Sequence, residues 1–287
     1  MTQSLRDLVE AELSQPVDPR VTAMAGAIAA KHGAASRAVL FYGSCLREKQ
    51  LDGLMLDFYL IVSEYPSAYD QRWLATANRL IPPNVFPFHH DGLAAKYAVL
   101  SERDFHRLNG PETRNVSVWA RFAQPSRLVW SAGQAAREAV VGAVARAAPT
   151  LLAAAGRVGG EPVLDWWRRA FSLTYSAELR AERKGRAGSV IDSDLERYER
   201  FFPAVVAAID PAIPAGGWLR RRAEGKLLSV LRLTKASATY AGGAEYIAWK
   251  INRHAGTAIE LKPWQKRHPL LAAISLLPKL LTSGAVR

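Results

Sequence analysis

The sequence contains a single cysteine, Cys45, among its 287 residues, so no disulfide can form within the chain. This scarcity favours a reducing compartment. Cys45 follows a Gly-Ser pair, where a nucleophile is conceivable, but no histidine pattern accompanies it. We therefore interpret Cys45 as a small packing residue.

Long apolar runs are also missing. No uninterrupted apolar stretch reaches the roughly 20 residues that a membrane-spanning helix requires. Residues 1–20 contain four acidic side chains and no apolar core, so we expect no secretory signal peptide. Any contact with a membrane is therefore expected from one side only.

Acidic residues are outnumbered, with 26 Asp and Glu against 38 Lys and Arg and a net charge of +12. Such a surface attracts nucleic acid, nucleotides or anionic lipid, and charge does not choose among them. The 49% hydrophobic and 22% charged residues are typical of a soluble globular protein. The length suggests one large or two ordinary domains.

The most informative stretch is Phe41–Ser63. Residues 39–42 are strand formers that end at Gly43-Ser44, and Leu56–Val62 is an apolar run interrupted only by Asp57. A Gly-Ser pair after a strand offers backbone N–H groups and a hydroxyl to a phosphate, and an Asp on the next strand can hold Mg²⁺. The pattern favours nucleotidyl transfer, although a tight turn followed by a strand with a solvated Asp fits it equally well.

The remaining pattern is mainly helical. Helices are expected over 2–13, 21–31, 69–80, 135–155, 166–182, 195–208 and 218–239, and a third strand over 96–100. Ser101 is expected to cap a helix that has Asp104 in its first turn. We interpret Phe86–Asp91, with its adjacent histidines, as a loop. Residues 115–130 alternate aromatic and basic groups and suit either a nucleic-acid surface or an element that packs its aromatics inward, the latter being favoured.

Residues 246–287 differ in kind from the rest. They contain seven Lys and Arg against one acid, Glu260, together with Trp249 and Trp264. The apolar patch Leu270–Leu281 is too short to cross a bilayer but suits its interface. We expect this segment to attach the protein to a membrane surface.

Three stretches in order resemble one family. They are Tyr42-Gly43-Ser44 with Leu56-Asp57-Phe58, Lys96–Val99 leading to Trp119–Pro125, and Leu173–Arg180. Together they resemble the mitochondrial-type phosphatidate cytidylyltransferases (CDP-diacylglycerol synthases), also described as translocator assembly and maintenance proteins, of the nucleotidyltransferase (polymerase β-like) superfamily.

This chain departs from the family pattern at a few positions. Tyr59 stands where other nucleotidyltransferases have a second Asp, and this family characteristically lacks that Asp too. Gln124 replaces a usual Lys, for which Arg127 lies close enough to substitute, and Ala177 and Glu178 replace Gly and Asp.

The resemblance implies an α+β fold. Residues 1–133 would form a nucleotidyltransferase domain, 134–245 a mainly helical domain, and 246–287 the basic membrane-attaching segment. It also implies a Mg²⁺-dependent reaction of CTP with phosphatidate that gives CDP-diacylglycerol and pyrophosphate for phospholipid synthesis. The protein would be peripheral, on the cytoplasmic face of a bacterial inner membrane or the matrix side of the mitochondrial one.

The resemblance also implies roles for particular residues. Ser44 and Asp57 would be catalytic, with Asp57 as the metal ligand. The nucleotide would be bound by Gly43, Ser44, Arg121, Arg180 and Lys184. No nucleic-acid partner is implied. Two alternatives stay open: a nucleotidyltransferase acting on a soluble or RNA acceptor, and an inactive membrane-associated relative.

Overall fold

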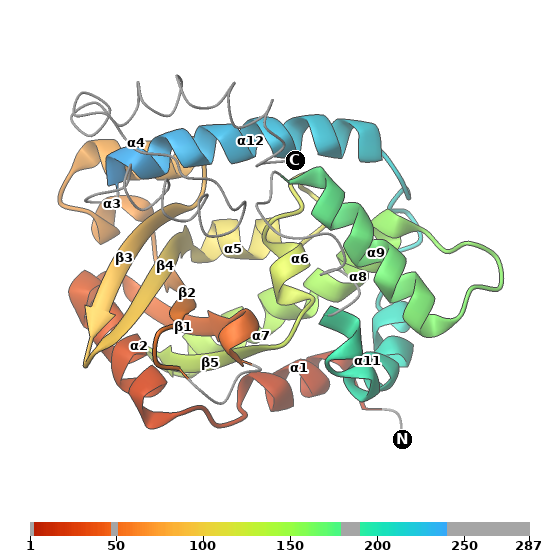
Figure 1. The fold of residues 1–287 in the computed structure, drawn as a ribbon, viewed down its shortest axis with the longest axis horizontal. Helices are drawn as coiled ribbons and strands as arrows, with labels where there is room; N and C mark the ends of the chain where they lie inside the picture. The colour runs from red at the N-terminus through yellow and green to blue at the C-terminus, as the bar shows by residue number, and fades with distance from the viewer. Residues whose placement is uncertain (1–2, 47–50, 179–189, 240–287) are drawn as a thin grey trace.

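The computed structural model describes residues 3–46, 51–178 and 190–239, and within these ranges the fold is α+β (Figure 1). The strands are β1 (Ser36–Tyr42), β2 (Met55–Val62), β3 (Asn84–His90), β4 (Leu93–Ser101) and β5 (Ser126–Ser131). The first helices are α1 (Leu5–Leu13), α2 (Pro19–His32), α3 (Tyr65–Ala68), α4 (Arg72–Leu80), α5 (Glu102–Leu108) and α6 (Trp119–Phe122), with 3-10 turns η1 (Gly33–Ala35) and η2 (Ser44–Leu46). The later helices are α7 (Gln134–Ala145), α8 (Ala147–Ala155), α9 (Val163–Ala177), α11 (Leu195–Ala207) and α12 (Trp218–Thr239).

In the described part of the chain, the five strands form one mixed sheet in the order β3-β4-β2-β1-β5. The β2–β4 pair is parallel and the other pairs are antiparallel. The sequence pattern predicts β1, β2 and β4 correctly. It misses β3 and β5, the two outer strands of this order.

The interpretation of Phe86–Asp91 as a loop is wrong. Residues up to His90 belong to β3, which pairs with β4 through a hairpin whose two turn residues, Asp91 and Gly92, have φ angles of 46° and 74°. Two consecutive positive φ angles match the twist of the adjoining strands. Pro87 cannot donate to a ladder, and an outer strand tolerates this.

Alternate residues of the central strands enter two different apolar clusters. Val39, Phe58 and Leu60 pack on the side covered by α2. Leu40, Tyr59 and Ile61 point to the opposite side, where α1 and the helices from α5 to α11 form the larger cluster. Side chains alternate across a strand, so Asp57 belongs to the side of Tyr59 and Ile61. The one charged residue of β2 therefore faces the helical half of the protein.

The helices of the second half share the larger cluster with the sheet. Buried residues from Leu8 to Val205 belong to it, so the core is continuous across the boundary expected between residues 133 and 134. The helix expected over 135–155 is divided into α7 and α8 at Arg146. The stretch Gln134–Ala155 is long and apolar enough to span a membrane, but 67% of its most apolar window is buried inside the protein.

The aromatic side chains of 115–130 pack inward. Trp119 and Phe122 of α6 are fully buried in the larger cluster, and β5 follows them directly. This bears out the favoured packing alternative over a nucleic-acid surface for these two residues. The expected cap of α5 is also present, since the Ser101 side chain accepts a hydrogen bond from the Asp104 backbone N–H.

Helix α12 returns from the helical half to the sheet. It lies along one side of the molecule in Figure 1 and contacts both α9 and β3. Arg232 donates from Nε to the Pro82 carbonyl at 2.8 Å, next to the start of β3. The last described helix is thereby placed against the loop that leads into the sheet.

Candidate functional site

Gly43, Ser44 and Asp57 lie together at one end of the sheet. Strand β1 ends at Tyr42, which pairs with Asp57 near the start of β2, and Asp57 in turn pairs with Lys96 on β4. Gly43 and Ser44 follow Tyr42 directly. The Gly43-Ser44 turn and the Asp57 carboxylate therefore lie next to each other, as a common site for a phosphate and a metal ion would require.

Gly43 packs directly against Asp57. Its φ of +95° lies in the region that L-residues rarely adopt, and a Cβ atom placed on it would lie 3.2 Å from Asp57 Oδ2. Both the conformation and the contact call for glycine. The turn thus fixes the position of the carboxylate as well as its own backbone.

Asp57 forms an ion pair with Lys96, whose Nζ lies 3.0 Å from Oδ1. Both side chains are largely shielded, with 21% and 26% of their surface exposed. Lys96 belongs to one of the stretches that carry the family resemblance, but the resemblance implies no role for it. The pairing of β2 with β4 brings the two charges together. The sequence pattern of a single segment does not predict which strands pair, so this contact could not be predicted.

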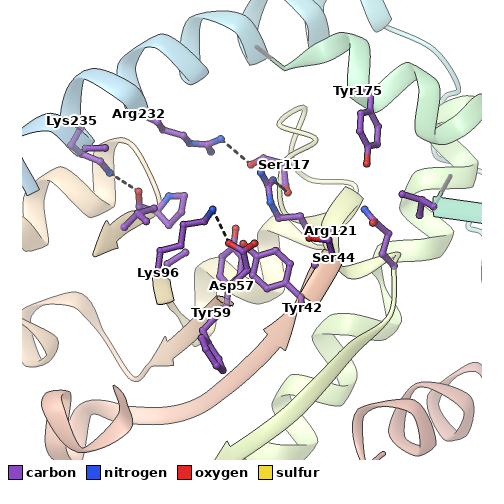
Figure 2. A pocket seen from close by; sticks show the side chains of 18 residues that line it. Tyr42, Ser44, Asp57, Tyr59, Lys96, Ser117, Arg121, Tyr175, Arg232 and Lys235 are labelled. Atoms are coloured by element: carbon purple, nitrogen blue, oxygen red, sulfur yellow. Dashed lines mark hydrogen bonds and ion pairs between the residues drawn. The ribbon is translucent and has the colours of Figure 1, made fainter. Parts of the chain in front are cut away.

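A cavity of about 330 Å³ opens over this end of the sheet (Figure 2). Its floor comes from β1, β2 and β4, and its other sides come from α6, α9, α12 and the segments before β3 and α6. The polar residues that line it are Tyr42, Ser44, Asp57, Tyr59, Lys96, Ser117, Arg121, Gln124, Tyr175, Arg232 and Lys235. Four of these are cationic and one is a carboxylate, so the cavity suits an anionic ligand.

Arg121, which the resemblance assigns to the nucleotide, lines the cavity. Its Nη1 is 3.6 Å from Glu178 Oε1 and also donates to the Ser117 carbonyl. Burial lowers the pKa of Arg121, but Glu178 and the nearby Tyr59 raise it more, so the pKa lies above its ordinary value. Glu178, one of the departures from the family pattern, therefore neutralises Arg121 and holds it in place.

Two further cations come from α12 and were not singled out from the sequence. Arg232 donates from Nη1 to Ser117 Oγ at 2.9 Å, and Lys235 donates to the carbonyls of Ile81 and Pro83, the latter at 2.9 Å. Burial lowers the pKa of Lys235 to about 7, with a further lowering from the charge of Arg232. The sequence pattern predicts that both residues belong to a helix over 218–239. The fold shows that they line this cavity.

The hydroxyl groups of Tyr42 and Tyr59 do not offer a base. Burial raises the pKa of both above its ordinary value, and Asp57 adds to this effect at Tyr42. Both phenols therefore stay protonated near neutral pH. No histidine is among the described residues that line the cavity.

The other residues expected at the site have different outcomes. Gln124 lines the cavity, whereas Arg127 donates to Gln15 and to the Ser126 carbonyl and does not line it. The expected substitution of Arg127 for the missing Lys is therefore wrong. Arg180, Lys184 and the segment 246–287 lie outside the described residues. Cys45 is buried in the smaller cluster, as expected of a packing residue.

The donor set suits a Mg²⁺ ion that arrives with a nucleotide. Asp57 is the one carboxylate among the described residues that line the cavity, and the described residues contain no group of three metal-binding side chains. Mg²⁺ is commonly bound by one or two carboxylates plus substrate phosphates and water. Asp57 is paired with Lys96 through Oδ1, so a Mg²⁺ ion would share this carboxylate with the ammonium group or displace it.

Comparison with known proteins adds no identification. No protein-family model and no curated protein sequence matches the chain significantly.

Proposed function

We propose that this protein is a Mg²⁺-dependent nucleotidyltransferase that transfers the cytidylyl group of CTP to phosphatidate at a membrane surface. The observation that carries the proposal is the contact of Gly43 with Asp57 at the floor of a cavity rich in cations. A Gly-Ser turn and a strand carboxylate are the two parts that nucleotidyl transfer needs in one place. The specific substrates rest on the family resemblance.

The lining residues have direct uses in this chemistry. Nucleotidyl transfer needs positioning and charge neutralisation more than covalent help. The backbone N–H groups of the turn and the Ser44 hydroxyl would bind the CTP phosphates, and the guanidinium group of Arg121, held by Glu178, would donate further hydrogen bonds to them. Asp57 would hold Mg²⁺, which supplies Lewis-acid stabilisation of the charge that develops on the phosphates.

The reaction balances without a protein base. An oxygen of the phosphatidate phosphate forms a bond to the α-phosphorus of CTP, and the bond from that phosphorus to the bridging oxygen breaks, so that pyrophosphate leaves. The phosphate monoester of the acceptor is already largely ionised near neutral pH, so no proton must be removed from it. The protonated state of Tyr42 and Tyr59 and the absence of a histidine among the described lining residues are consistent with such a reaction.

Two other functions fit the same cavity. A net charge of +12 suits RNA or a soluble acceptor as well as a lipid. A relative that binds nucleotide without catalysis would keep the same turn and carboxylate. Trp119 and Phe122 are buried and so are not available for base stacking, although Tyr175 lines the cavity.

A comparison of acceptors tests the proposal. The full chain is incubated with labelled CTP and Mg²⁺ in parallel with phosphatidate vesicles, glycerol 3-phosphate and RNA. We expect label in the chloroform-extractable lipid only. Label in either soluble acceptor would identify that acceptor as the substrate in place of phosphatidate. If no acceptor is labelled in any of the three reactions, the result would favour the non-catalytic relative.

The C-terminal segment is proposed to recruit the enzyme to anionic bilayers. Each basic residue near such a surface contributes about 1 kcal/mol. Replacing Lys262, Lys266 and Arg267 with glutamine is therefore expected to weaken sedimentation with anionic vesicles by about 100-fold at low salt. Affinity for CTP is expected to stay within about twofold, because the replaced charges act on the membrane.

The control for this prediction replaces three exposed cations elsewhere, Lys31, Arg72 and Arg103, with glutamine. This variant lowers the net charge equally and is expected to sediment nearly as the parent does. Equal loss in both variants would mean that net charge alone drives attachment. No loss in the first variant would remove the anchor from residues 246–287.

A further inference from the structure

Within the part of the chain that the structure describes, Arg232 and Lys235 form no ion pair, unlike the other two cations of the cavity. Lys96 is paired with Asp57 and Arg121 with Glu178. Within the described residues, the hydrogen-bond partners of Arg232 and Lys235 are the carbonyls of residues 81–83 and the Ser117 hydroxyl, all of them neutral. The two side chains from α12 are therefore the basic groups of the cavity that no described carboxylate holds by an ion pair.

One nitrogen of Arg232 has no hydrogen-bond partner within the described structure. Nε and Nη1 are occupied, but Nη2 is buried and unpaired. Leaving a buried charged donor unsatisfied costs free energy, and a bound anion would remove this cost. Figure 2 shows Arg232 and Lys235 reaching from α12 toward the sheet, with Asp57 and Lys96 across the cavity.

Two anionic reactants must approach each other in the proposed reaction, on which this inference rests. The Gly-Ser turn and Asp57 serve the nucleotide at the floor of the cavity. A second set of donors is needed so that the acceptor phosphate can enter against the charge of the triphosphate. We propose that Arg232, Lys235 and Ser117 form the subsite that binds the phosphate monoester of the acceptor.

The protonation state of Lys235 should change when the subsite binds a phosphate, and this change can be measured. Burial and the charge of Arg232 lower the pKa of Lys235 to about 7. Burial also lowers the pKa of Arg232, and the charge of Glu178 partly offsets this. Above about pH 7 the Lys235 amine is mostly neutral in the free protein. A bound phosphate dianion favours the ammonium form, so binding at about pH 8 takes up a proton.

The test measures binding of a phosphate monoester directly, by titration calorimetry of the full chain. The probes are dihexanoyl phosphatidate, glycerol 3-phosphate and inorganic phosphate, with dihexanoyl phosphatidylcholine, a zwitterionic phosphodiester, as the control that lacks a phosphate monoester. The variants are Arg232→Gln and Lys235→Gln, and the matched control is Lys226→Gln, an exposed cation on the same helix that does not line the cavity. Buffers of different ionisation enthalpy report proton uptake.

We expect both cavity variants to weaken binding of dihexanoyl phosphatidate by about 10- to 100-fold, because each removes a hydrogen bond to a charged group. Lys226→Gln is expected to bind as the parent does. Proton uptake is expected to disappear in Lys235→Gln. In turnover assays, both variants are expected to raise KM for phosphatidate and leave KM for CTP unchanged, which a merely structural role would not do.

The outcomes separate this subsite from the proposed function. A loss of CTP affinity in place of acceptor affinity would assign the two cations to the nucleotide and overturn the subsite. Phosphatidate binding that needs Arg232 and Lys235, in a protein that transfers nothing from CTP, would support the subsite and overturn the function. Equal affinity for glycerol 3-phosphate would keep the subsite and identify a soluble monoester as its ligand. If Arg232→Gln does not fold, it is replaced by Arg232→Lys, which keeps the charge. This variant is also expected to raise KM for phosphatidate and to leave KM for CTP unchanged.

Discussion

Replacing Asp57 with asparagine is expected to lower turnover by about 10³-fold or more, because metal-assisted charge stabilisation is worth several kcal/mol. Asparagine keeps the shape of the side chain beside Gly43 and removes the charge that would hold Mg²⁺. The fold is expected to persist, although loss of the largely shielded ion pair with Lys96 costs about 1–3 kcal/mol. Steady-state turnover and thermal unfolding of the same preparation measure the two effects.

Asp52→Asn is the matched control for this variant. Asp52 lies in the connection that leads into β2, is 69% exposed and forms its own ion pair with Arg20 at 3.0 Å. The control is expected to keep parental turnover. Turnover near the parental value in Asp57→Asn would remove the metal assignment and, with it, most of the proposed mechanism.

Replacing Gly43 with valine is expected to abolish measurable turnover. The new side chain would occupy a strained backbone conformation and displace Asp57, whose Oδ2 would lie 3.2 Å from the added Cβ. The strain alone costs about 1–3 kcal/mol of stability. Ser44→Ala, which removes one hydroxyl and leaves the turn in place, is expected to reduce turnover far less.

Gly33→Val separates strain from contact. Gly33 also has a positive φ, of +52°, but an added Cβ would meet no atom within 4 Å. Both variants are expected to lose stability, and only Gly43→Val is expected to lose turnover and CTP affinity. If Gly43→Val binds and converts CTP as the parent does, the turn has only a structural role.

The sequence predicts the part of the site that is contiguous along the chain. Gly43, Ser44 and Asp57 belong to one strand-turn-strand unit whose alternation and turn residues are visible locally. Lys96 enters through parallel pairing of β2 with β4, and Arg232 through the return of α12 to the sheet. These contacts join residues far apart in the sequence, so no local period indicates them.

Strands β3 and β5 are missed by the sequence pattern because they too depend on pairing with distant segments. In β3, Pro87 and the adjacent histidines 89 and 90 obscure the alternation that identifies a strand. That strand forms because β4 offers it a pairing edge and Asp91-Gly92 closes the hairpin. In β5, the short run Ser126–Ser131 pairs with β1 and has no strong pattern of its own.

The most direct test of the central claim is the fate of the label in CTP. The full chain is incubated with phosphatidate vesicles, Mg²⁺ and CTP labelled at either the α- or the γ-phosphate, and the extracted lipid and released pyrophosphate are counted. We predict that only the α-label enters lipid, with one pyrophosphate released per lipid formed, and that Asp57→Asn gives neither product. Lipid labelled from the γ-phosphate, or no labelled lipid from the parental protein, would contradict the account.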